Sequence, residues 1–261
     1  MTKLQIGTIL MAIALFLGLY FGCDTNPPEQ AAIEKSRALT VESTDINALL
    51  LEAKSGMGPQ EESEILALET EMEAAADDSS SARVLKELSG KWYEFGQPAI
   101  AGFYAEEVAG LENSGAAWSI AGTTYALCLQ TKPPDKIRDF CSSRAVKAFE
   151  NAISLDPEEV SNRVNLALVY TEAPPPDNPM KGILMLRDLN EQYPENVSVL
   201  VNLSRLALQT GQYDRAVERL QQALELDAGN RQAACLLAQA YQGLGRQSEA
   251  EEWASRCNSP E

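Results

Sequence analysis

The chain has 261 residues, of which 45% are hydrophobic, and it carries a formal net charge of −17 with no histidine. Such acidity argues against a nucleic-acid-binding protein, because the chain would repel a phosphate backbone. Since histidine is the commonest transition-metal ligand and the usual general base near neutral pH, its absence argues against a zinc enzyme or a hydrolase. No glycine-rich phosphate-binding motif occurs. We therefore expect no enzymatic activity and no cofactor.

An apolar segment without charged residues, residues 4–22, lies at the start of the chain. As a helix it would span roughly 28 Å, close to the thickness of the hydrocarbon core of a bilayer. Residues 1–23 are therefore predicted to form an uncleaved signal anchor. We expect a single-pass inner-membrane protein whose remainder lies on the exported, periplasmic side. Because Lys35 and Arg37 follow closely, the positive-inside rule leaves a cytoplasmic-facing orientation as the alternative.

Cys23 permits a second interpretation of this segment. It directly follows Gly22, as the lipidated cysteine of a bacterial lipoprotein follows its signal, although Tyr20 and Phe21 fit that signal poorly. Ordinary cleavage would need a small-residue, A-x-A-like site, and none is found. A signal anchor and a lipoprotein attached through Cys23 are thus the two alternatives for membrane attachment.

Residues 24–81 form an acidic linker and helical segment, with fourteen Asp or Glu against three Lys or Arg. Ranges 29–40, 45–54 and 61–76 are compatible with helices, and the Gly- and Pro-containing range 55–59 breaks the last two apart. In the third range, Ile65, Leu68 and Met72 fall on one apolar stripe. This stripe is expected to pack on the domain that follows, with self-pairing or partner docking as alternatives.

Residues 197–257 contain the same helical hairpin twice, at a spacing of 34 residues. The corresponding pairs are Leu203 and Leu237, Gly211 and Gly245, Ala216 and Ala250, and Ala223 and Cys257. Each copy has an apolar stripe at helical spacing, a glycine-containing turn, and a second helix with small residues on one face. Because neither hairpin can bury its apolar face alone, the copies must stack.

The pattern extends toward the amino terminus. The residues that repeat it are Trp118, Gly122 and Tyr125, then Ala145, Phe149, Ala152 and Pro157, and the pairs Asn165-Leu166 and Asn202-Leu203. In these residues the chain resembles the tetratricopeptide repeat. The resemblance implies an all-α fold, an α-solenoid of about five hairpins over residues 82–261. Its units are 82–114, 115–159, 160–196, 197–230 and 231–261, with enlarged turns around residues 131–141 and 174–176.

In this family the first helix of each unit lines a concave groove that binds a peptide or protein partner. Carried onto this sequence, the groove positions are Lys86, Tyr93, Ser119, Thr123, Val164, Leu168, Val201, Arg205, Gln239 and Gln242. Most of these side chains are small, apolar or amide, and Arg205 is an isolated cation. A clamp for a partner's terminal carboxylate is therefore not expected, whereas an extended or helical peptide with apolar anchors suits the groove.

Four cysteines of the repeat region have two interpretations. Cys128 ends the first helix of the second unit and Cys141 follows its enlarged turn, so a disulfide between them would close that turn. Cys235 and Cys257 lie near the open end of one hairpin, so they could also approach each other. Such bridges need an oxidising compartment. The alternative is that each cysteine is a small buried apolar residue.

Together these features predict a membrane-anchored scaffold that binds peptide or protein partners in the groove of its solenoid. A self-associating structural scaffold, held together as a homo-oligomer by the acidic helices and the solenoid, is the alternative.

Overall fold

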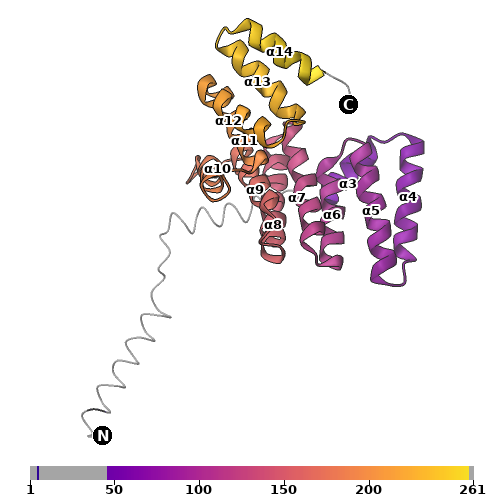
Figure 1. The fold of residues 1–261 in the computed structure, drawn as a ribbon. Helices are drawn as coiled ribbons and strands as arrows, with labels where there is room; N and C mark the ends of the chain where they lie inside the picture. The colour runs from indigo at the N-terminus through magenta and orange to yellow at the C-terminus, as the bar shows by residue number, and fades with distance from the viewer. Residues whose placement is uncertain (1–4, 6–45, 259–261) are drawn as a thin grey trace. The chain divides into compact units, whose positions relative to one another are not determined.

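The computed structural model describes Gln5 and residues 46–258, and within 46–258 every regular element is an α-helix (Figure 1). The helices are α3 (Ile46–Ser55), α4 (Pro59–Glu73), α5 (Asp78–Glu94), α6 (Pro98–Glu112), α7 (Gly115–Gln130), α8 (Asp135–Leu155), α9 (Val160–Glu172), α10 (Lys181–Gln192), α11 (Val197–Gln209), α12 (Tyr213–Leu226), α13 (Arg231–Gly243) and α14 (Gln247–Asn258).

From α5 onward the helices pair in chain order into the hairpins α5–α6, α7–α8, α9–α10, α11–α12 and α13–α14. The second helix of each hairpin packs on the first helix of the next, so the hairpins stack in succession from α5 to α14 (Figure 1). Large, fully buried side chains such as Trp92, Tyr125 and Phe149 lie in this stack. The predicted all-α solenoid is therefore confirmed for these residues.

Three of the hairpins contain the same turn. Gly96, Gly211 and Gly245 all have φ of 71°, a backbone region that favours glycine because it has no Cβ. In each turn the amide of the following residue donates to a carbonyl five residues earlier, as Gln212 does to Ala207 at 2.8 Å. The spacing of 34 residues seen in the sequence thus corresponds to a repeated three-dimensional turn at Gly211 and Gly245.

Other glycines allow close packing between helices. A Cβ on Gly122 of α7 would lie 2.8 Å from the ring of Phe149 on α8, and one on Gly102 of α6 would lie 2.5 Å from the ring of Tyr125. Neither position has room for a side chain. The buried aromatic rings therefore set how closely α6, α7 and α8 approach one another.

The two acidic helices before the hairpins lie close to their predicted positions. Ile65 of α4 is 1% exposed and belongs to a core cluster with Leu88 and Trp92 of α5, against which Leu68 and Met72 also pack. The expected packing of this stripe within the same chain is confirmed. Helix α5 begins at Asp78, whose neighbour Asp77 caps it, so the first hairpin starts before the predicted boundary at residue 82.

The predicted enlarged turn around residues 131–141 is wrong. Helix α7 ends at Gln130 and α8 already begins at Asp135, so the turn is short and the additional residues lengthen the second helix. Phe140 and Cys141 are buried within this extension. The turn after α9 is long, as expected, because residues 173–180 with their four prolines do not continue the helix.

The predicted inner-membrane localisation is contradicted by the structure. A transmembrane helix needs about 20 predominantly apolar residues, and no helix in the described part of the chain is long and apolar enough to cross a bilayer. The longest, α8, has 21 residues but includes charged ones such as Arg144. The proposed anchor at residues 4–22 falls outside the described residues, Gln5 excepted, as do Cys23 and the predicted helix 29–40.

Candidate functional site

Helices α5, α6 and α7 enclose an apolar groove with a volume of about 350 Å³. Gly90 of α5 lies on one side and Ile120 of α7 on the other, and Ala105 and Val108 of α6 line it as well. Ile120 keeps 62% of its surface exposed. We refer to this feature as the α5–α7 groove.

The groove is open because α5 presents small side chains to it. A Cβ on Gly90 would meet nothing within 4 Å, so space lies above this residue. The neighbouring Ser89 donates its hydroxyl to the carbonyl of Ala101 at 2.9 Å. Its polarity is thereby satisfied within the protein, and the groove offers mainly apolar surface.

One ion pair lies at the edge of the groove. Lys86 of α5 and Glu112 of α6, which both line it, approach to 2.5 Å. Their charges compensate each other, so the groove has no unpaired charge to attract an ion. An apolar side chain is the group for which this surface is best suited.

One of the four predicted residues of the first two units lines this groove. Lys86 lines it directly. Tyr93 and Thr123 are exposed and lie three residues beyond Gly90 and Ile120, on the same faces of α5 and α7. Ser119 is half-buried.

Two predicted groove residues are core residues instead. Val164 is 1% exposed and packs among the buried side chains of α9, α10 and α11, and Val201 is 3% exposed and packs with those of α11, α12 and α13. No partner can reach either valine. Leu168 and Arg205, which come from the same two helices as these valines, are half-buried.

The predicted residues of the last unit lie elsewhere. Gln239 and Gln242 line a depression of about 320 Å³ between α13 and α14 that also contains Cys235 and Cys257. The ten predicted positions therefore do not form one continuous site among the described residues.

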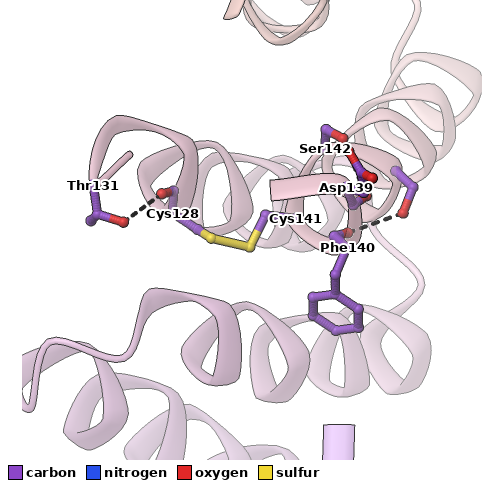
Figure 2. The surroundings of a disulfide bond; sticks show 7 residues. Cys128, Thr131, Asp139, Phe140, Cys141 and Ser142 are labelled. Carbon is purple, nitrogen blue, oxygen red and sulfur yellow. Dashed lines mark hydrogen bonds between the residues drawn. A yellow bond between two sulfur atoms is a disulfide. The ribbon is translucent and has the colours of Figure 1, made fainter. Parts of the chain in front are cut away.

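Both cysteine pairs are joined by disulfides in the structure. Cys128 of α7 and Cys141 of α8 have their Cα atoms 6.2 Å apart, and Figure 2 shows the bridge crossing between the two helices. Cys235 and Cys257 join α13 to α14 with a Cα separation of 4.8 Å. Each bridge therefore connects the two helices of a single hairpin.

Sequence reasoning missed Gly90 and Ile120. The predicted positions on α7 were Ser119 and Thr123, and Ser119 is one residue from Ile120, a shift that rotates a side chain by roughly 100° around a helix. A signal was nevertheless present at Gly90. A glycine in a helix interior costs about 1 kcal/mol relative to alanine, so one found there often has a packing or functional reason.

Comparison with known proteins supports the repeat. Residues 207–256 match the sequence family described as tetratricopeptide repeat. The crystal structure of a thermophilic tetratricopeptide-repeat protein of Thermus thermophilus aligns with a TM-score of 0.51 and 17% identity, over 67% of this chain and 89% of that one.

Other solved structures align less well. MamA (residues 41 to the end) from Desulfovibrio magneticus RS-1 gives a TM-score of 0.45 at 17% identity, over 70% of this chain and 94% of that chain. YrrB, described as a tetratricopeptide-repeat protein with an unusual peptide-binding site, gives 0.39 at 15% identity, over 73% and 90%. A comparison with curated proteins found no match. Residues 207–256 are thus a tetratricopeptide-repeat segment, within a solenoid that has the fold of a tetratricopeptide-repeat protein.

Proposed function

We propose that this protein is a scaffold for protein–protein interaction and that its α5–α7 groove receives an apolar side chain from a partner peptide. The observation that carries the proposal is the exposed Ile120 beside the open space above Gly90. Burying a large aliphatic side chain in such a place stabilises a complex by roughly 1.5–3 kcal/mol. The groove is thus an anchor point for a peptide.

Tyr93 supports this proposal. It lies three residues beyond Gly90 on α5 and is 52% exposed. Tyrosine is enriched among the residues that dominate binding energies at protein interfaces, because it offers a large apolar ring and a polar end. A peptide anchored next to Ile120 would reach Tyr93 by continuing along the same helix faces.

The test is to fill the groove without harming the fold. Peptides are selected from a displayed random library with the full chain, and their affinities are then measured for Gly90→Leu by fluorescence anisotropy. Because the leucine occupies the anchor's place, binding should weaken by about tenfold or more. The same substitution should raise the stability of α5 by about 0.5–1 kcal/mol, since leucine is the better helix former.

Gly110→Leu is the matched control. Gly110 is also a helical glycine with open space above it, but it does not line the groove. Its substitution should stabilise the protein and leave peptide affinity unchanged. Selected peptides that bind Gly90→Leu as tightly as the parent chain would exclude the groove as the binding site.

A further inference from the structure

A second and larger cavity, of about 750 Å³, lies between α10, α11 and α12. Its apolar lining includes Ile183 of α10 with Leu203 and Leu206 of α11. It shares no residue with the α5–α7 groove and is formed by other hairpins. Its volume is within the range of pockets that hold ligands in proteins.

Three arginines line the same cavity. Arg187 belongs to α10, and Arg215 and Arg219 belong to α12. No aspartate or glutamate is among the lining residues. The cavity therefore concentrates positive charge, although the whole chain has a net charge of −17.

These arginines lack ion-pair partners among the described residues, whereas Arg83, Arg144 and Arg246 have them. Arg215 donates a hydrogen bond to the side-chain oxygen of Gln212 at 2.7 Å, and this amide oxygen is a neutral acceptor.

Arg219 of α12 is half-buried. Burial, with a contribution from the nearby Arg215, lowers the pKa of its guanidinium, and Glu218 opposes this shift. The protein thus holds like charges close together at the edge of an apolar cavity, and an anion bound there would relieve their repulsion.

The long turn between α9 and α10 contributes to this cavity. Met180 lies in that turn, is 50% exposed and lines the cavity. The corresponding turns of the last two hairpins, at Gly211 and Gly245, are much shorter. Because methionine adapts its shape to irregular apolar partners, the additional length supplies an apolar contact that the shorter turns do not offer.

We propose that this cavity binds an acidic segment of a partner protein, with an apolar side chain of that segment over Ile183 and Leu206. Carboxylates of the segment accept hydrogen bonds from the arginines at the cavity's edge. Arginine suits this role because its planar guanidinium binds a carboxylate through two parallel hydrogen bonds. The inference does not depend on the α5–α7 groove, which has a different chemistry.

The experiment uses the full chain and a fluorescein-labelled acidic peptide, EESLEESLEESL, with its glutamine analogue QQSLQQSLQQSL. The acidic peptide should bind at least about tenfold more tightly than the analogue, because a hydrogen bond to a charged group contributes about 1.5–3 kcal/mol. Its affinity should fall as salt is added. Equal affinities for the two peptides would overturn the proposal.

Charge reversal then locates the binding. Arg187→Glu together with Arg215→Glu should weaken binding of the acidic peptide by roughly a hundredfold, since each lost contact is worth about tenfold. Both residues are exposed, and circular dichroism checks that the helices remain.

Arg205→Glu together with Arg256→Glu is the control with the same change of charge, because Arg205 of α11 and Arg256 of α14 do not line the cavity. A loss of binding as large in this control would show that only net charge matters and would refute a site.

A second copy of this chain is a competing occupant. Leu66 of α4 is 61% exposed on an acidic helix, so it has the required chemistry. Light scattering of the full chain distinguishes a separate partner from a second copy of the chain. A monomer at micromolar concentrations supports a separate partner. An oligomer that dissociates in the double arginine variant would assign the cavity to self-association and overturn the proposed partner.

Discussion

Glu106 is the only charged side chain buried in the described part of the chain, at 7% exposure. Its carboxylate accepts hydrogen bonds from the Tyr125 hydroxyl at 2.9 Å, from Arg144 at 3.0 Å and from Lys147 at 3.1 Å. Burial of a charge is unfavourable unless hydrogen bonds and opposite charges compensate for it. Burial, and next the nearby Glu106, raise the pKa of Tyr125. The tyrosine therefore stays a neutral donor, and one residue of α6 holds α7 and α8 together.

Replacing Glu106 should destabilise the fold. Glu106→Ala leaves the buried Tyr125 hydroxyl without its acceptor, and we expect the free energy of unfolding to fall by about 1–3 kcal/mol. Chemical denaturation followed by circular dichroism measures the change. Glu252→Ala is the control, because Glu252 and Arg256 form an exposed pair, and such pairs contribute little. Equal effects of the two substitutions would refute a special role for Glu106.

At the scale of elements, the turn between the two helices of a hairpin depends on its glycine. Gly211 and Gly245 have the same left-handed φ of 71°, and each turn is closed by the same backbone hydrogen bond. A residue with a Cβ is strained in this conformation. The glycines that repeat in the sequence at a spacing of 34 residues thus occupy positions at which the backbone conformation favours glycine.

Alanine at either glycine should therefore cost stability. We expect Gly211→Ala and Gly245→Ala each to lower the free energy of unfolding by about 1 kcal/mol. The strain of a Cβ at positive φ outweighs the benefit of a smaller loss of backbone entropy on folding. Asparagine tolerates the left-handed region better, so Gly211→Asn should lose less than Gly211→Ala. Thermal denaturation of the three variants checks this order. If alanine were tolerated as well as asparagine, φ would not be the constraint.

How much of the structure was predictable differs between elements and side-chain positions. The hairpins were predictable because apolar spacing and turn glycines are local signals. The extension of α8 was not, because Pro133 and Pro134 resemble a loop, whereas proline is tolerated just before and at the start of a helix. Val164 and Val201 were misplaced because a groove position and a core position differ only in their rotation around the helix. That rotation depends on packing with neighbouring units.

At the scale of the whole molecule, the hairpins are not equally secured. Disulfides close α7–α8 and α13–α14, while the two hairpins between them, α9–α10 and α11–α12, have none. Helix α10 contributes few buried residues, namely Gly182, Leu186 and Leu189, and it follows the long turn 173–180. In a stack held by contacts between neighbours, stability is the sum of such local terms. The α9–α10 hairpin is therefore the weakest part of the stack.

Hydrogen exchange should detect this difference. Amides of α10 should exchange faster than those of α8, which buries Phe140, Cys141 and Phe149 among others, because regions with fewer buried contacts open more readily. Mass spectrometry of the oxidised protein measures both helices in one experiment. Equal protection in α8 and α10 would show that the solenoid opens only as a whole.

The placement of the disulfides also determines how the molecule responds to force. The bridges span sequence separations of 13 and 22 residues, and at about 3.5 Å per extended residue they withhold roughly 120 Å of contour length. If the chain were pulled from its ends, the helices outside the two bridged loops, α5–α6 and α9–α12 among them, would extend freely while residues 128–141 and 235–257 stayed closed. The oxidised solenoid would thus lengthen on both sides of its first bridged loop, and its full extension would become available only after reduction.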